Sequence, residues 1–394
     1  MGRVYLDYAG ACPVDERVFK VMKPFILKPG NALALHEDGQ IAKRKIEEAR
    51  LYISHLISAD NPEGVIFTSG ATESNNLALI GMGERLKNKG NHIITSSIEH
   101  ISVINSLKKL EKNGFEVTRI PVDRDGVIKL DLLEAAVKEK TVMITIQAAN
   151  TEIGVIQPLD EIGKIAAEHG IVFHCDATAG LGQMTIDVKK SNISLLTMSS
   201  NSIYGPQGVG ALYLTPNMRP IPQIIGGGQQ RGFRSGTENL AGIIGMGEAA
   251  RITALEMRSD WERLKNLRDR LIKEIPERVP DAYLNGHPLK RTPNNVNFRI
   301  DYVEGESIVL SLDILAGISV STGAACASLT LEPSHVILAL GVPPEKAQGL
   351  LQITMGRFTK EEDVNRLLDA LPGVVERLRR MSPLTPAKYF SKEG

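Results

Sequence analysis

The sequence lacks an excess of charge of either sign. Its 394 residues include 46 Lys and Arg and 46 Asp and Glu, so the formal net charge is zero. No overall electrostatic attraction draws such a chain toward nucleic acid or an anionic membrane surface. We therefore expect no nucleic-acid partner and no membrane partner, and we look for function in local sites.

Long apolar runs and clustered cysteines are lacking as well. No run approaches the roughly 18 apolar residues of a membrane span, and the first residues carry no secretory signal pattern. The three cysteines, Cys12, Cys175 and Cys326, lie far apart, which excludes a Cys-x-x-Cys motif and a disulfide framework. The sequence predicts a cytoplasmic protein in which each cysteine acts as a single thiol.

Short β-rich runs alternate with helical patterns in the first two thirds of the chain. The runs at 64–68, 92–95, 141–146 and 170–175 predict strands, and the patterns at 73–89 and 159–167 predict helices between them. This alternation is typical of an α/β fold with a mostly parallel sheet covered by helices on both faces. Ligands of such sheets bind at the carboxyl ends of the strands.

The last third of the chain predicts a smaller α+β domain. A charged helical tract at 248–273 ends the alternation, and a β-like run at 296–300 and helical runs at 307–315, 336–340 and 361–381 follow it. We predict three parts: an N-terminal arm at 1–14 associated with the small domain, a large domain at 15–261, and a small domain at 262–394 that carries Cys326.

Polar residues follow the predicted strands of the large domain. After the first strand, Ser69 to Glu73 combine a glycine, a hydroxyl residue at the expected helix N-cap and an acid in the first turn, a form of helix start that binds phosphate. His100, Asn150 and Asp176 follow the next three strands. Each is an ordinary turn or cap residue when taken alone, and a lone acid such as Asp176 is more often solvated. Four such strand ends together favour a polar ligand site.

Three further loops carry small or polar residues. The loop at 197–208, between apolar runs, can cradle an anion with hydroxyl and backbone N–H groups or can be a plain turn. The glycine tract at 226–237 has no G-x-G-x-x-G pattern, which excludes a dinucleotide fingerprint. The loop at 320–329 places Cys326 among Gly, Ala and Ser, which suits a nucleophile or a metal ligand as well as a small core residue.

These motifs together resemble the cysteine desulfurases of the NifS/IscS type, which are pyridoxal-phosphate enzymes of fold type I. The resemblance spans nearly the whole chain, through the segments at 5–8, 67–74, 152–155, 234–237, 302–307 and 356–358. The Cys326 loop and the Leu-Glu-Pro-Ser segment at 331–334 look like the longer-loop branch, which passes sulfur to iron–sulfur scaffold proteins. The resemblance implies a homodimer, L-cysteine as substrate and an IscU-like scaffold as partner.

The resemblance also implies roles for individual residues. Cys326 matches the cysteine that carries the persulfide. The residues matching the family's cofactor site are Ala71, Thr72 and Ser199 at the phosphate, Thr237 supplied there by the second subunit, His100 stacked on the pyridine ring, Asn150 in contact with it, and Asp176 at the pyridinium nitrogen. His100 is a catalytic candidate together with Cys326.

The sequence departs from the family pattern at positions that take part in the family's reaction. Asn201 and Ser202 stand where the family has His and the Schiff-base Lys, Ala179 where it has Gln, and Gln352 where an Arg binds the substrate carboxylate. General acid–base catalysis contributes roughly 10² to 10⁴ in rate, and a charge-assisted carboxylate contact about 1.5 to 3 kcal/mol. A serine forms no imine, so pyridoxal phosphate would bind without a covalent bond.

Three functional hypotheses follow from these residues. The favoured one is a desulfurase-like protein of iron–sulfur cluster assembly with little or no activity of its own, in which Cys326 carries sulfur or ligates a cluster shared with the scaffold. The alternative is a fully active desulfurase with a substitute base. A related lyase or aminotransferase ranks last, because it needs the lysine and does not need Cys326.

Overall fold

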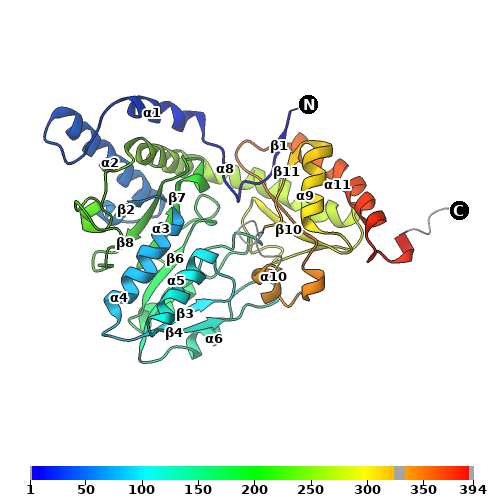
Figure 1. Cartoon of the computed structure of the whole chain (residues 1–394), viewed down its shortest axis with the longest axis horizontal. Coiled ribbons are helices and arrows are strands. Elements are labelled where there is room, and N and C mark those ends of the chain that lie inside the picture. The colour runs from blue at the N-terminus through cyan, green and yellow to red at the C-terminus, as the bar shows by residue number, and fades with distance from the viewer. Residues whose placement is uncertain (1, 324–332, 390–394) are drawn as a thin grey trace.

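The computed structural model describes residues 2–323 and 333–389 of the chain (Figure 1). A seven-stranded sheet in the order β2-β8-β7-β6-β5-β3-β4 forms its centre. The strands are β2 (Val65–Thr68), β3 (His92–Ser96), β4 (Glu116–Ile120), β5 (Thr141–Thr145), β6 (Val172–Asp176), β7 (Leu195–Ser199) and β8 (Gly210–Leu214). The strands from β7 to β4 in this order pair in parallel, while β8 is antiparallel to both of its neighbours. The predicted mostly parallel α/β sheet is confirmed.

One strand of this sheet was not predicted. The runs at 64–68, 92–95, 141–146 and 170–175 correspond to β2, β3, β5 and β6, and the apolar runs on either side of the loop at 197–208 correspond to β7 and β8. Only β4 carries no apolar run. It lies at the edge of the sheet and pairs with β3, and most of its side chains are partly exposed. An edge strand with polar residues such as Glu116 and Arg119 gives a weak strand signal, because half of its surface faces water.

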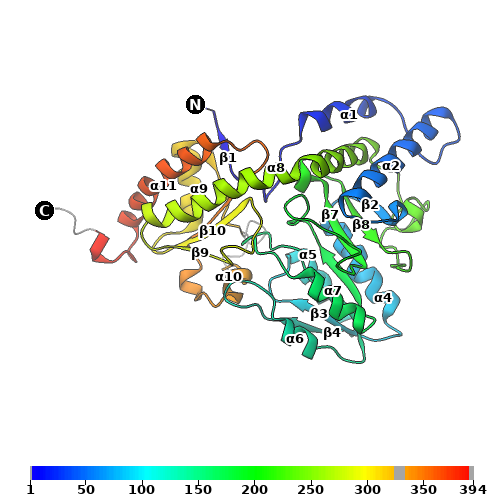
Figure 2. The same cartoon turned by 180° about the vertical axis from the view of Figure 1, so that it is seen from behind.

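Helices cover both faces of the seven-stranded sheet (Figures 1 and 2). They are α1 (Glu16–Leu27), α2 (Glu37–Leu56), α3 (Ala71–Asn76), α4 (Met82–Leu86), α5 (Ile101–Lys112), α6 (Leu130–Ala135) and α7 (Leu159–Glu168). A π-helical turn, η2 (Leu77–Gly81), joins α3 to α4 in one continuous helical run, so the pattern at 73–89 predicted one helix correctly. Adjacent strand residues point to opposite faces: Ile94 packs in the core with α2 and α7, whereas Ile93 packs with α4 and α5.

Helix α8 (Leu240–Arg278) connects the two halves of the molecule (Figure 2). It has 39 residues and includes the charged tract predicted as helical at 248–273. Its first part packs Ile243 and Ile252 into the core of the seven-stranded sheet, and its last part packs Leu264 and Leu271 into a second core. One long helix therefore contributes to both hydrophobic cores.

The second core surrounds a three-stranded antiparallel sheet in the order β12-β10-β9. Its elements are β9 (Ala282–Leu284), β10 (Asn295–Ile300), α9 (Gly305–Ala316), β12 (Leu350–Thr354) and α11 (Glu361–Met381). Helix α10 (His335–Ala339) instead packs into a small separate cluster with residues that follow β3 and β5. The N-terminal strand β1 (Val4–Tyr5) pairs in parallel with β11 (Ile318–Ser319), and Val4 and Leu6 are buried in this core. The N-terminal arm therefore packs against the C-terminal part of the chain.

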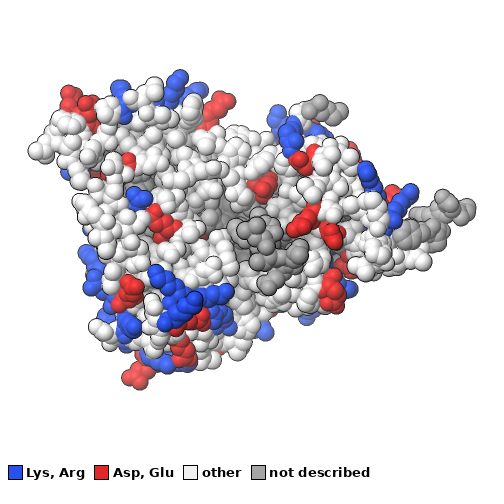
Figure 3. Space-filling view, in the orientation of Figure 1, with Lys and Arg blue, Asp and Glu red and all other residues white. Residues whose placement is uncertain are grey.

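The surface of the described residues has no separate field of one charge on the face shown in Figure 3, where Lys and Arg lie among Asp and Glu. This distribution agrees with the zero net charge. No helix in the described part of the chain is both long enough and apolar enough to cross a membrane.

Candidate functional site

The strand ends chosen from the sequence meet at one edge of the seven-stranded sheet. Asp176 ends β6 and Ser199 ends β7. Asp176 pairs with Thr197 on the neighbouring strand, so Asp176 and Ser199 lie close together. Ser199 pairs in turn with Gly210 of β8, which pairs with Thr68 of β2. The register therefore brings the start of α3, just beyond Thr68, beside Ser199.

A close backbone contact fixes this arrangement. A Cβ at Gly210 would lie 2.6 Å from the Cα of Gly70, so glycine is required where β8 meets the turn before α3. The N-cap of α3 is Gly70, and no side chain of the described residues caps it. The expected hydroxyl N-cap is therefore wrong. Because no side chain of the described residues accepts a hydrogen bond from the N–H groups of Ala71 and Thr72, these groups can bind an anion.

Asp176 is a buried carboxylate without a cationic partner among the described residues. Its side chain accepts hydrogen bonds from Asn75 Nδ2 at 2.8 Å, from the Thr178 backbone N–H at 2.9 Å and from Thr178 Oγ1 at 2.6 Å. It is 5% exposed, so the alternative of a solvated turn residue is wrong. A buried charge of this kind is stabilised by a ligand that brings a positive N–H group, such as a pyridinium.

His100 is the N-cap of α5, at the start of the helix that follows β3. Its Nδ1 lies 2.7 Å from Ser102 Oγ and accepts the Ser102 backbone N–H at 3.2 Å. Asn75 Nδ2 donates to the same Ser102 hydroxyl at 2.9 Å. The candidate ring-stacking residue and the candidate pyridinium partner are thus connected through two side chains.

Asn75 and Ser102 were not identified from the sequence. The available signal in the sequence was the polar pair Ser74 and Asn75, which directly precedes an apolar stretch of the same helical pattern from Leu77 onward. The structure shows that both polar side chains are fully buried. Ser102 follows His100 by two residues, a spacing that permits a local side-chain hydrogen bond.

Asn150 holds a turn after β5. Its Oδ1 accepts the backbone N–H groups of Glu152 and Ile153 at 2.9 Å each, and its Nδ2 donates to Ile98 O at 2.9 Å. Only one amide hydrogen therefore remains for a ligand. The side chain is buried beside the segment that leads from β3 to His100.

The loop after β7 is held from several sides. Ser199 Oγ donates to Asn201 Oδ1, and residues Ser200–Ile203 form a short 3-10 helix, η3. Tyr204 follows with φ 66°, a left-handed conformation that is uncommon for a tyrosine. Its hydroxyl accepts the Arg357 backbone N–H at 2.8 Å, and the Arg357 guanidinium lies 4.4 Å from its ring centroid.

Two cysteines near these strands are structural thiols. The Cys12 backbone N–H donates to Asn201 O at 3.1 Å, and its Sγ lies 3.7 Å from Ser202 O, so Cys12 packs against the loop backbone. Burial raises the pKa of the Cys12 thiol to about 12 and that of Cys175 well above its usual range. Both thiols are therefore protonated at neutral pH and unsuited to nucleophilic attack.

No lysine of the described loop replaces the residue at 202. Lys189 and Lys190, which precede β7, lie at the surface and pair with Asp60 at 2.8 Å and with Asp160. The side chain at 202 is a half-buried hydroxyl. This end of the site offers no amine.

Gln352 connects the two sheets at this site. From β12 its Nε2 donates to Thr151 O at 2.6 Å and to Glu152 O at 2.9 Å. Asn297 Nδ2 donates to the same Glu152 carbonyl at 3.1 Å, and Asn295 Nδ2 reaches it at 3.2 Å. The Gln352 amide is therefore committed to backbone carbonyls of the turn that Asn150 holds.

The remaining predicted residues are more dispersed. Thr237 is exposed, three residues after Arg234, whose Nε donates to Glu73 Oε1 at 3.0 Å in the first turn of α3. Cys326, predicted as the persulfide carrier or a metal ligand, lies outside the described residues. Within the described residues, no three His, Cys, Asp or Glu side chains gather as ligands for a metal ion.

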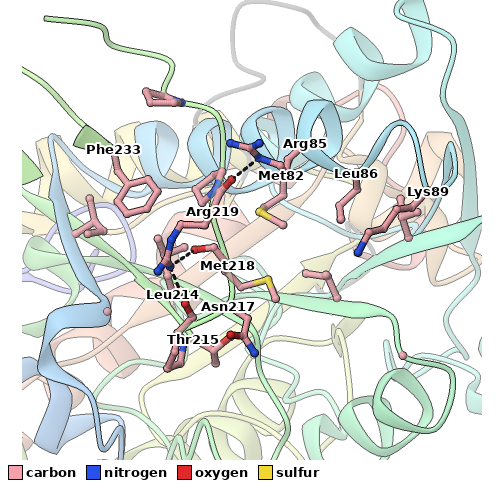
Figure 4. A pocket seen from close by; sticks show the side chains of 18 of the residues that line it. Met82, Arg85, Leu86, Lys89, Leu214, Thr215, Asn217, Met218, Arg219 and Phe233 are labelled. Atoms are coloured by element: carbon pink, nitrogen blue, oxygen red, sulfur yellow. Dashed lines mark hydrogen bonds between the residues drawn. The ribbon is translucent and has the colours of Figure 1, made fainter. Parts of the chain in front are cut away.

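A large cavity, shown in Figure 4, lies near the amino ends of strands β5 and β6. It has a volume of about 1230 Å³ and includes Thr141 and Val172, the first residues of β5 and β6. Two of its arginines are held by backbone carbonyls: Arg85 Nε donates to Arg219 O at 2.9 Å, and Arg219 Nη1 to Pro216 O at 2.7 Å. The third, Arg231, pairs with Glu63 at 2.9 Å. The residues chosen at the carboxyl strand ends do not line it.

The carboxyl edge fits one part of a pyridoxal-phosphate site and not another. The open first turn of α3 beside Ser199 suits a phosphate, and the buried Asp176 carboxylate suits a pyridinium nitrogen. Ser202 supplies no group for covalent attachment. The residues present therefore fit a cofactor that is held without a covalent bond.

Comparisons with known proteins agree with this geometry. Residues 4–367 match the family described as aminotransferase class-V. The chain is 53% identical over 381 residues to the cysteine desulfurase IscS 1 of Archaeoglobus fulgidus, covering 96% of this chain and 99% of that protein. A solved structure described as a NifS-like protein matches with a TM-score of 0.89 at 32% identity, covering 95% of this chain and 100% of that one. Another, described as SspA in complex with cysteine, matches with a TM-score of 0.79 at 33% identity, covering 91% and 100%.

Proposed function

Because the chain belongs to the class V aminotransferase family and, within it, to the cysteine desulfurases of the IscS and NifS type, we propose that it is a desulfurase-like protein of iron–sulfur cluster assembly whose own desulfurase activity is weak or absent. The family reaction converts L-cysteine to L-alanine and leaves the sulfur as a persulfide. The observation that carries the proposal of weak activity is the hydroxyl of Ser202 in the loop after β7, where the family places its Schiff-base lysine.

The chain's own residues would hold pyridoxal phosphate without that lysine. The N–H groups of Ala71 and Thr72 would bind the phosphate, the Ser199 hydroxyl would join them by turning its hydrogen away from Asn201 Oδ1, and Asp176 would accept the pyridinium N–H. His100 would stack on the ring and Asn150 would contact it. Pyridoxal phosphate supplies an electron sink when bound, and Asp176 would maintain the positive ring nitrogen on which that property depends.

Substrate handling is weakened by two further side chains. Gln352 is neutral, and its amide is bound to the carbonyls of Thr151 and Glu152, so it offers no cation to a substrate carboxylate. Ala179 lies three residues after Asp176 and has no polar group with which to contact the cofactor ring. Losing a charge-assisted carboxylate contact costs about 1.5 to 3 kcal/mol, or roughly 10- to 100-fold in affinity.

We assign the remaining role to Cys326. In this proposal it carries sulfur delivered from another source, or ligates an iron–sulfur cluster shared with an IscU-like scaffold, and the cluster is cargo rather than a resident cofactor. A homodimer in the cytoplasm, in which Thr237 of the second subunit reaches the phosphate, completes the proposal.

One sample tests the activity. Purified protein mixed with pyridoxal phosphate and L-cysteine should show no visible band of a lysine-bound cofactor and should produce almost no alanine or sulfide. Alanine production that is robust and depends on Cys326 would instead support the alternative, an active desulfurase with a substitute base.

A second experiment tests the role of Cys326. The complex with a scaffold protein is loaded with cluster, and retention of the visible cluster absorbance is followed for the wild type, Cys326→Ala and Cys12→Ala. The proposal expects loss of retention with Cys326→Ala alone, because Cys12 is buried. Equal retention in all three proteins would remove the ligand role and leave sulfur transfer.

A further inference from the structure

A chain of side chains links His100 to Asp176 beneath the candidate site. From Asp176 it passes to Asn75 Nδ2 at 2.8 Å, from Asn75 Nδ2 to Ser102 Oγ at 2.9 Å, and from Ser102 Oγ to His100 Nδ1 at 2.7 Å. The residues come from α3, α5 and β6. The donor and acceptor roles along this chain can be assigned from its two ends.

The Asp176 end fixes the orientation of the Asn75 amide. The Asp176 Oδ2 oxygen accepts a hydrogen bond, so the Asn75 atom that faces it is the nitrogen. The same nitrogen carries a second hydrogen, which Ser102 Oγ accepts. The hydroxyl hydrogen of Ser102 is then free to point away from Asn75.

The His100 end fixes the orientation of the Ser102 hydroxyl. The Ser102 backbone N–H, which can only donate, points at His100 Nδ1 at 3.2 Å, so Nδ1 is an acceptor. The Ser102 hydroxyl therefore donates its hydrogen to Nδ1 as well. The ring proton of His100 must then reside on Nε2, which makes no hydrogen bond within the described residues.

We propose that Asn75 and Ser102 are positioning residues that hold His100 with its ring proton on Nε2, so that His100 presents a hydrogen-bond donor, and not a base, to the bound ligand. The same Asn75 amide holds Asp176, so one buried side chain sets both groups. This inference rests on the proposed function for the identity of the ligand, but the tautomer itself does not depend on any ligand.

The burial of Asn75 supports a functional role. Its side chain is fully buried, and its Oδ1 has no hydrogen-bond partner among the described residues. An unsatisfied buried oxygen is destabilising, and an apolar residue at this position of α3 would avoid that cost. The amide is retained at the one place where its nitrogen reaches both Ser102 and Asp176.

Nitrogen-15 NMR of the histidine rings tests the tautomer directly in the protein without added cofactor. Comparison with His100→Gln assigns the His100 signals. We expect the proton on Nε2 in the wild type and in Ser102→Thr. Ser102→Ala keeps the backbone N–H that faces Nδ1 but loses the hydroxyl donor, and Asn75→Ala releases the Ser102 hydroxyl to rotate, so a minor fraction with the proton on Nδ1 should appear in both variants. The matched controls are Ser106→Ala, whose hydroxyl bonds Ser102 O at 2.8 Å, and Asn76→Ala, whose amide bonds Thr72 O at 2.8 Å; neither should change the His100 signals.

A proton on Nδ1 in the wild type, or an unchanged tautomer in a folded Ser102→Ala variant, would overturn the inference. If Asn75→Ala fails to fold, Ser102→Ala and Ser102→Thr still decide the question. Pyridoxal-phosphate binding, followed by fluorescence, forms a separate arm in which Asn75→Ala should bind about 10-fold more weakly because Asp176 loses a donor. Absence of cofactor binding in the wild type would count against the proposed function and leave the tautomer result intact.

Discussion

The side-chain amide of Gln352 donates to the backbone carbonyl of Glu152 at 2.9 Å, which ties the three-stranded sheet to a turn after the seven-stranded sheet. Both ends of this contact are at the candidate site, since Asn150 holds the same turn. Gln352 therefore has a structural task in this chain.

Replacing Gln352 by Ala should destabilise the protein by about 1 to 3 kcal/mol, because it removes a buried side chain with two hydrogen bonds and leaves the half-buried Thr151 carbonyl with only the longer contact to Asn295 Nδ2 at 3.3 Å. Denaturant unfolding measures this change as a lower midpoint with an unchanged slope. Gln223→Ala is the matched control, since Gln223 is exposed and bonds only Ile221 O within the described residues. Equal midpoints for the two variants would mean that Gln352 does not tie the sheets together.

Introducing a lysine by Ser202→Lys should restore covalent attachment of pyridoxal phosphate, because an amine would then stand at the family position. Borohydride reduction followed by mass spectrometry should detect the adduct in Ser202→Lys and in neither the wild type nor Asn201→Lys. Desulfurase activity should stay low, since Gln352 still offers no positive charge to the substrate. Full activity in the single variant would show that the carboxylate contact is dispensable.

The buried His174 should make the protein sensitive to acid. Its ring nitrogens lie 2.8 Å from Thr145 Oγ1 and 3.0 Å from Thr197 Oγ1, and burial lowers its pKa from 6.5 to about 4. Between these values the unfolded chain binds a proton that the folded chain does not, so stability falls as the pH falls from 6.5 toward 4, by up to about 1.4 kcal/mol per pH unit.

His174→Gln removes that titration and can keep one of the threonine contacts. Its unfolding free energy, although lower overall, should depend less on pH between 6.5 and 4 than that of the wild type. His55→Gln, at an exposed position of α2, serves as the control and should retain the wild-type slope. If the unfolding free energy of His174→Gln depends on pH as steeply as that of the wild type, the acid sensitivity does not come from His174.

The buried Glu99 should make the protein less stable at alkaline pH, which is the opposite of the effect of His174. Burial raises its pKa from 4.5 to about 8, with Asp176 adding to the shift, and its Oε2 has no partner among the described residues. Between pH 4.5 and 8 the folded chain holds a proton that the unfolded chain has released, so stability falls as the pH rises through this window. The limiting slope is again about 1.4 kcal/mol per pH unit.

The unfolding free energy of Glu99→Gln should fall less between pH 5 and pH 8 than that of the wild type. The difference in stability between the variant and the wild type should therefore shift in favour of the variant as the pH rises. Chemical unfolding at the two pH values measures the difference, with the exposed Glu84→Gln as control. If Glu99→Gln and the wild type lose stability in parallel from pH 5 to pH 8, Glu99 is ionised in the folded protein and the prediction is wrong.

The strand ends illustrate how far sequence patterns reach. Apolar runs with helical patterns between them predicted β2, β3, β5 and β6, and the connection rule for parallel sheets brought the segments after them to one edge. The pattern failed at β4, where an edge position removes the apolar signal. It also failed at Gly70, because the choice between a side-chain cap and an open helix start depends on the approach of Gly210 from another strand.

The sequence by itself determined the α/β class, the family resemblance, and the absence of a lysine at 202, because periodicity and residue identity are local properties of the chain. The tertiary structure decided that Asp176 is buried and not solvated, that Cys12 packs against the loop backbone, and that Gln352 is committed to carbonyl oxygens. It also joined Asn75, Ser102 and Asp176, which are up to 101 positions apart. Burial and hydrogen-bond partnership depend on which distant segments meet, and that follows from the packing of the whole sheet and its helices.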